Sequence, residues 1–187
     1  MPTLLPGDLA RVGVYATRRG SMAKIKTITT MSVLTALALI IFIVEAQIPA
    51  LFAIPGIKLG LANVVTLIAL KLLGRRQAGM ILAARIILGS IFTGNFSVIL
   101  YSGVGGILCY TVMSLSLCRI TQLWVVSVLG ALAHNAGQLL VASLILRSAS
   151  VYLYLPPLII SAIITGAFTG LCAAYICKYQ KWLKPPS

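Results

Sequence analysis

Residues 27–48, TITTMSVLTALALIIFIVEAQI, form an apolar run of 22 residues in which Glu45 is the single charged side chain. A helix needs about 20 predominantly apolar residues to cross a bilayer. Lys24 and Lys26 precede the run, and Pro49 follows it. The run therefore predicts a membrane-spanning helix with a basic flank before it and a break after it.

Five further apolar segments follow, separated by residues typical of turns. The chain has 187 residues, of which 60% are hydrophobic and 9% are charged, whereas a soluble domain has about 25% charged residues. We therefore predict an all-α integral membrane protein, a bundle of six transmembrane helices. The segment with Arg85 is the shortest, so whether it crosses the whole bilayer stays open. The five segments span approximately residues 57–73, 77–92, 96–117, 123–146 and 152–177.

The positive charges fall mainly on one side of this predicted bundle. With the N-terminus inside, twelve Lys and Arg residues lie on the cytoplasmic side, while Lys58 and Arg147 lie outside. Because cytoplasmic flanks carry the excess of Lys and Arg, we predict a multi-pass protein of the cell membrane with both termini in the cytoplasm. The net charge of +13 then reflects topology and contact with membrane lipids. Nucleic acid is not an expected partner, because the charges form no basic patch with interleaved aromatic residues.

The N-terminal part of the chain differs in composition from the rest. We interpret residues 1–23 as a disordered basic leader, residues 24–180 as a single transmembrane domain and residues 181–187 as a cytoplasmic tail. Met22 offers an alternative start, in which case residues 1–21 are an extension.

The first apolar segment also has features of a secretory signal. Lys24 and Lys26 precede its apolar run, and Val44 and Ala46 provide the small residues of a cleavage site. The run of about twenty residues is longer than the usual signal core, and five more segments follow. A retained helix is therefore the favoured interpretation.

The residue inventory argues against catalysis and against a resident metal or cofactor. Asp8 and Glu45 are the only acids, so the chain cannot form the paired acidic motifs that hold magnesium and diphosphate. No CxxC pair occurs, and we interpret the cysteines as reduced packing residues. They are Cys109, Cys118, Cys172 and Cys177.

Small residues four positions apart predict where helices approach closely. Such pairs occur in the first and last segments and at the start of the second. Examples are Ser32 with Ala36, Gly56 with Gly60, and Gly166 with Gly170.

Polar side chains within the apolar segments are the candidates for function, because each is costly in lipid and needs a reason. They come from five segments and fall between the centre and the outer side of the predicted bilayer. Lys58, Arg85 and His134 give this region an excess of basic groups, which favours a small anionic or strongly polar ligand. The predicted binding residues are Glu45, Lys58, Asn63, Arg85, Tyr101, His134, Asn135 and Gln138.

Structural roles compete with this interpretation. Glu45 and Arg85 are equally suited to pairing with each other and joining two helices. His134 alone is suited to a hydrogen bond with a backbone carbonyl, and Lys58 to a lipid headgroup. A membrane scaffold without a ligand therefore stays an alternative.

The polar positions carry a family resemblance. The run PGIKLGLANVVTL at 55–67 resembles the most recognisable stretch of the Gx transporter family, whose members are often labelled heptaprenyl diphosphate synthase component I. The run RIILGS at 85–90, Tyr101-Ser102 before Gly105-Gly106, and AHNAGQL at 133–139 match the same pattern. The resemblance covers about residues 24–180.

The family is similar to the substrate-binding S components of energy-coupling-factor (ECF) vitamin transporters. This similarity implies an S-component-like six-helix bundle, a solute-binding role and energy from partner ATPases. It also implies docking of the first helix on a coupling subunit through Ser32 and Ala36, where the family usually has two alanines. The synthase label instead implies a non-catalytic accessory subunit for polyprenyl diphosphate or menaquinone metabolism, or for a membrane redox complex, with an isoprenoid or quinone-like ligand.

Overall fold

The structure is a computed structural model that describes residues 6–47, 60–94 and 97–179. Every regular element in these ranges is a helix, which confirms the predicted all-α class. The elements are α1 (Pro6–Gln47), α2 (Asn63–Leu72), α3 (Arg75–Thr93), α4 (Ser97–Ser116), α5 (Leu123–Leu146), the 3₁₀-helix η1 (Ala149–Tyr154) and α6 (Leu155–Tyr179).

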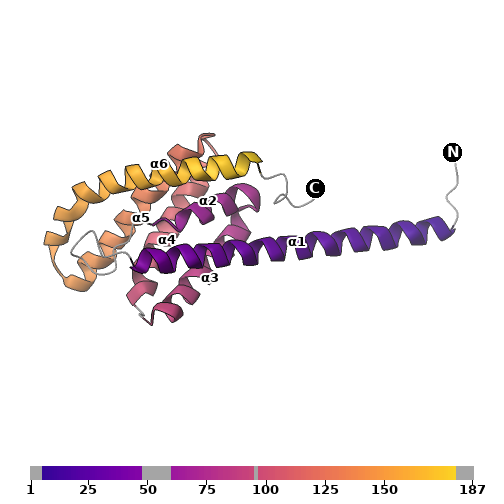
Figure 1. The fold of residues 1–187 in the computed structure, drawn as a ribbon, viewed down its shortest axis with the longest axis horizontal. Coiled ribbons are helices and arrows are strands. Elements are labelled where there is room, and N and C mark those ends of the chain that lie inside the picture. The colour runs from indigo at the N-terminus through magenta and orange to yellow at the C-terminus, as the bar shows by residue number, and fades with distance from the viewer. Residues whose placement is uncertain (1–5, 48–59, 95–96, 180–187) are drawn as a thin grey trace.

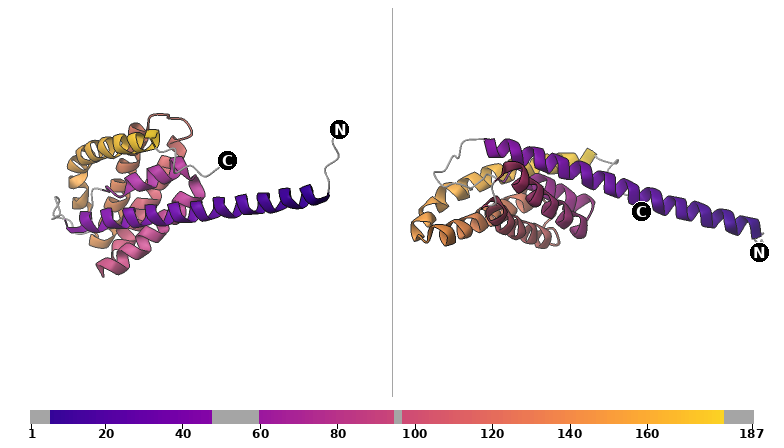
Figure 2. Two further views of the ribbon diagram at one scale, coloured as in Figure 1. Left: turned by 45° about the vertical axis from the view of Figure 1, so that its right-hand side comes forward. Right: turned by 90° about the horizontal axis from the view of Figure 1, so that it is seen from below.

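The helices form one bundle around α5 and the short α2 (Figures 1 and 2). α5 packs along both α4 and α6, and α1 packs on α3. α2 is only ten residues long, yet it contacts all five of the other α-helices. The N-terminal part of α1 extends beyond the bundle, as Figure 1 shows.

Four helical stretches within the described residues are long and apolar enough to cross a membrane, so the chain is a multi-pass membrane protein by length and composition. α2 is too short for this class, and α3 carries Arg75, Arg76 and Arg85. The count of six transmembrane helices therefore stays a prediction. The four stretches are Ser21–Gln47, Ile99–Ser116, Leu123–Leu146 and Ala149–Tyr179.

The structure differs from the sequence analysis at the N-terminus. α1 begins at Pro6, so it includes most of residues 1–23, for which the sequence composition suggested disorder. The stretch contains Leu, Ala and Arg, which are good helix formers, and it continues directly into the apolar run. The division of the chain at residue 23 stays a prediction, and the predicted tail at 181–187 lies outside the described residues.

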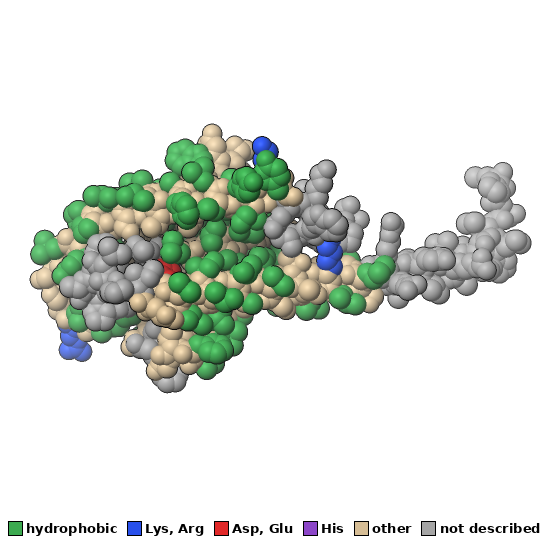
Figure 3. Space-filling view, in the orientation of Figure 1, with side chains coloured by type: hydrophobic (Ala, Val, Ile, Leu, Met, Phe, Trp, Pro, Cys, Tyr) green, Lys and Arg blue, Asp and Glu red, His purple; other side chains and the backbone are tan. Residues whose placement is uncertain are grey.

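The outer surface is apolar, as expected for helices that face lipid. Figure 3 shows hydrophobic side chains over the visible face, with the described Lys and Arg side chains toward its edges. On α6 the large apolar residues point outward and the small ones inward. Ile160, Ile164, Phe168 and Leu171 are exposed, whereas Ala162, Gly166, Gly170 and Ala173 are buried.

The small residues of α6 let it approach α5 closely. A Cβ atom on Gly166 would lie 2.7 Å from the Cα of Val128, and one on Gly170 would lie 2.4 Å from the Cα of Trp124. The close approach predicted for this pair is confirmed. The hydroxyl groups of Ser127 and Thr169 lie 3.0 Å apart in the same interface and form a buried interhelical hydrogen bond.

Two apolar clusters occupy the two ends of the bundle. The larger one includes Leu123 and Val126 of α5, and the ends of α2, α4 and α6 pack against it. The smaller one includes Tyr101 of α4 together with Leu139 and Val141 of α5. Because His134, Asn135 and Gln138 lie between these two sets on α5, the fold places a polar layer between two apolar ends.

Candidate functional site

The centre of the polar layer is a close contact between α4 and α5. A Cβ atom on Gly137 would lie 2.7 Å from the Cα of Gly105, so the two backbones nearly touch. His134 lies one turn earlier on α5 and is 3% exposed. A Cβ atom on Gly105 would lie 3.0 Å from its Nδ1, so the absence of a side chain at Gly105 makes room for the imidazole.

Gly60 brings three helices together at the other side of this imidazole. Its φ angle of +76° is one that L-residues with a side chain rarely adopt. A Cβ atom on it would lie 2.9 Å from Nδ2 of Asn63 and 3.0 Å from Cδ2 of His134. Its N–H donates a hydrogen bond of 2.5 Å to Oε1 of Glu45. Glu45 of α1, Asn63 of α2 and His134 of α5 therefore converge on one glycine.

Arg85 of α3 completes this group. Its side chain is 3% exposed, and a Cβ atom on Gly106 would lie 3.7 Å from its Nη2. The guanidinium lies close enough to Cys109, Glu45 and His134 for the charged forms of these groups to interact with it. Glu45, Asn63, Arg85 and His134, from four different helices, form what we call the polar cluster.

Several atoms of the polar cluster are buried without a hydrogen-bond partner among the described residues. They are Nδ2 and Oδ1 of Asn63 and Nε and Nη2 of Arg85. Buried polar groups are nearly always hydrogen-bonded, and each exception costs about 1–3 kcal/mol. The two Arg85 nitrogens are cationic donors, so the polar cluster is chemically suited to an anion or another strong acceptor.

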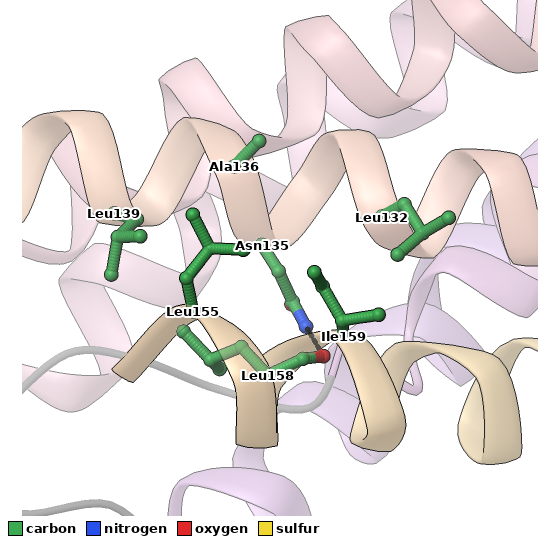
Figure 4. A pocket seen from close by; sticks show the side chains of 7 residues that line it. All are labelled: Leu132, Asn135, Ala136, Leu139, Leu155, Leu158 and Ile159. Carbon is green, nitrogen blue, oxygen red and sulfur yellow. Dashed lines mark hydrogen bonds between the residues drawn. The ribbon is translucent and has the colours of Figure 1, made fainter. Parts of the chain in front are cut away.

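The remaining predicted residues are outside the polar cluster as defined above. Asn135 is turned toward α6, where its Nδ2 donates a hydrogen bond of 3.0 Å to the Leu158 carbonyl oxygen (Figure 4). Tyr101 belongs to the smaller apolar cluster, and Gln138 is fully buried on α5. Lys58 lies outside the described residues.

The predicted docking residues are placed on the outer face of α1. Ser32 and Ala36 are exposed, and both line a groove of about 590 Å³ between α1 and α3. Met80, Ala84 and Leu88 form the α3 side of this groove. The geometry makes both residues accessible to a partner helix or to lipid.

Sequence reasoning missed the role of two glycines. Gly137 lies within the run AHNAGQL, but glycine is frequent in membrane helices, so its contact with Gly105 had no distinctive signal. Gly89 accommodates the ring of Phe42, whose Cε1 would lie 2.7 Å from a Cβ atom there. This contact joins α1 to α3 and so sets the positions of Glu45 and Arg85 relative to each other.

Residues 34–176 match the family model described as "Heptaprenyl diphosphate synthase component I". The matched range is more than half of the chain and includes all four members of the polar cluster. No curated protein and no solved structure gives a significant match.

Proposed function

The chain belongs to the heptaprenyl diphosphate synthase component I family, and from this premise we propose that it is a membrane-embedded substrate-binding subunit of an ECF-like transporter. It takes up a small anionic or amphipathic solute, which binds at the polar cluster. The supporting observation is the set of buried polar atoms on Asn63 and Arg85 that have no hydrogen-bond partner among the described residues. A bound anion would satisfy the donors among them, whereas a purely structural cluster would be expected to satisfy itself.

The proposed topology is six spans with both termini in the cytoplasm. The ends of α2, α4 and α6 pack on the same apolar cluster, so the basic residues beside them lie at one end of the bundle. At this end Arg75 donates hydrogen bonds from Nη2 to the Ser114 carbonyl oxygen and to Sγ of Cys118. Arg147 flanks α5 at its opposite terminus. The charge asymmetry therefore supports a cytoplasmic location for the first end.

Transport energy would come from partner ATPases. The chain contains no glycine-rich phosphate loop of the P-loop type, so it needs such partners for ATP hydrolysis. The groove that contains Ser32 and Ala36 supports docking of a coupling subunit on α1, because small residues there allow a partner helix to approach closely.

The family description favours a second candidate function. A component of a prenyl diphosphate synthase would be a non-catalytic membrane subunit, since the whole chain has only two acids and cannot hold magnesium diphosphate by itself. In that role the polar cluster would contact a diphosphate or quinone head. Copurification separates the two functions: a coupling subunit with ATPases supports uptake, whereas a prenyl synthase or a flavoprotein supports the accessory role.

The test of the polar cluster is native mass spectrometry of the detergent-purified protein, with extraction of small molecules from the same sample. We expect a stoichiometric anionic or amphipathic molecule on the wild type, and its loss from His134→Ala and Arg85→Met. Arg147→Met is the matched control, because Arg147 is exposed and distant from the polar cluster in the sequence and on α5. If no small molecule copurifies with the wild type and the cluster variants are merely less stable, the result would favour a membrane scaffold without a ligand.

A further inference from the structure

A second polar feature lies on the other side of α5, at a pocket that faces the lipid. The pocket has a volume of about 190 Å³ and lies between α5 and the start of α6 (Figure 4). Six of its seven lining residues are apolar, and Asn135 is the exception. The apolar ones are Leu132, Ala136, Leu139, Leu155, Leu158 and Ile159.

The pocket has a buried floor and an exposed mouth. Leu139, Leu158 and Asn135 are each at most 5% exposed. Ala136, Leu155 and Ile159 are exposed on the outer surface of the bundle. Because that surface is apolar, the mouth opens toward the hydrocarbon region of the membrane, and a ligand would enter sideways from the bilayer.

The orientation of the Asn135 amide is fixed by its neighbour. Its Nδ2 donates to the Leu158 carbonyl oxygen at 3.0 Å, so the other amide atom is the acceptor Oδ1. This Oδ1 is buried and has no hydrogen-bond partner among the described residues. Neither the carbonyl of Leu158 nor the apolar lining can donate a hydrogen bond to it. Because Asn135 lines the pocket, this unused acceptor is buried at the apolar pocket wall, a situation that a ligand with a donor would relieve.

We propose that this α5–α6 pocket is a lateral binding site for a small membrane-soluble alcohol or phenol, whose O–H donates to Oδ1 of Asn135 while its apolar body fills the pocket. An apolar cavity of about 150 Å³ accommodates benzene, so a pocket of this volume holds one substituted ring or a short branched chain. A hydrocarbon tail without a donor would fill the volume but leave Oδ1 unpaired. The proposal is independent of the polar cluster, because it uses a different face of α5.

The experiment compares two probes with the same ring, in one of which a methyl group replaces the hydroxyl hydrogen. 4-Fluorophenol and 4-fluoroanisole have the same fluorinated ring, but only the phenol can donate a hydrogen bond. Fluorine NMR titrations of the full-length protein in lipid nanodiscs, with empty nanodiscs subtracted, give the saturable binding of each. We expect 4-fluorophenol to bind about threefold to tenfold more tightly, which is the effect of one neutral hydrogen bond.

Three variants complete the test. Asn135→Leu should abolish the preference for the phenol. Ala136→Phe keeps the amide but fills the mouth, so it should remove saturable binding of both probes even if Asn135→Leu does not fold. Leu144→Ala, on the exposed face of the same helix, should bind like the wild type. Equal affinities for the two probes, binding unaffected by Ala136→Phe, or partition into lipid alone would each overturn the proposal.

Discussion

Gly137 of α5 lies so close to Gly105 of α4 that a Cβ atom on Gly137 would be 2.7 Å from the Cα and 3.0 Å from the N of Gly105. Real Cβ atoms essentially never make such contacts, so both positions need glycine for this helix pair to form. The contact fixes the depth and rotation of α5 beside α4. His134, three residues before Gly137, is thereby directed toward Gly60 and Asn63.

Alanine at Gly105 should separate α4 from α5. The new Cβ atom would lie 2.9 Å from the carbonyl oxygen of His134, a backbone atom that cannot move without shifting the helix. We expect Gly105→Ala to lower the free energy of unfolding by about 1–3 kcal/mol, as overpacking does. Gly103→Ala is the matched control, because beyond its own helix backbone and chain neighbours no described atom lies within 4 Å of a Cβ there. Denaturant unfolding in mixed micelles should find the control equal to or more stable than the wild type; equal destabilisation would contradict the packing argument.

The hydrogen bond between Ser127 and Thr169 should show a small coupling energy. A double-mutant cycle with Ser127→Ala and Thr169→Val measures the bond itself. Interhelical hydrogen bonds in membranes average about 0.6 kcal/mol and reach about 1.7 kcal/mol, so we expect a value within that range. Thr165→Val replaces a hydroxyl that bonds to Ser161 in its own helix. A cycle of Ser127→Ala with Thr165→Val should therefore show no coupling.

The sequence was sufficient to predict the features that depend on one helix at a time. The apolar run at 27–48, the inward small residues Gly166 and Gly170, and the basic end of the bundle follow from composition and spacing. Each of these features depends on the residues of a single helix, because the surrounding lipid favours apolar side chains on every helix in the same way. The structure confirms the helical class, whereas the six spans and the orientation stay predictions.

Which residues form the site depends on how each helix is rotated about its axis relative to its neighbours, and this rotation could not be predicted from the sequence. Consecutive residues on a helix point about 100° apart, so His134 and Asn135 face different neighbours. The partner of Asn135 is the backbone carbonyl of Leu158. Because every residue has such a carbonyl, the sequence carries no signal for this partner. Likewise, the turn at Gly60 that receives Glu45 depends on a positive φ angle, for which any glycine is suitable.

The bond between Glu45 and the Gly60 N–H predicts a difference between two substitutions. Glu45→Gln removes the charge but keeps a side-chain oxygen that can accept from the N–H. Glu45→Leu leaves the N–H without this acceptor and should cost about 1–3 kcal/mol of stability more than the glutamine variant. Thermal unfolding of both variants in the same detergent checks this. Equal losses would mean that the carboxylate acts by its charge alone.

Substitution of Arg85 distinguishes a ligand-binding role from a structural ion pair with Glu45. If the guanidinium serves a ligand, Arg85→Met should abolish binding of the copurified anion. It should change the stability of the ligand-free protein by less than about 1 kcal/mol, since Met fills a similar volume and removes Nε and Nη2, which have no hydrogen-bond partner in the described part of the chain. If Arg85 instead neutralises Glu45, its loss leaves an uncompensated buried charge, which costs about 3–5 kcal/mol.

The double variant Glu45→Gln with Arg85→Met separates these cases. If the two residues form an ion pair, the double variant regains most of the stability that Arg85→Met lost, because no lone charge remains. If Arg85 binds a ligand, the double variant loses only the stability that Glu45→Gln loses, and it still fails to bind the anion.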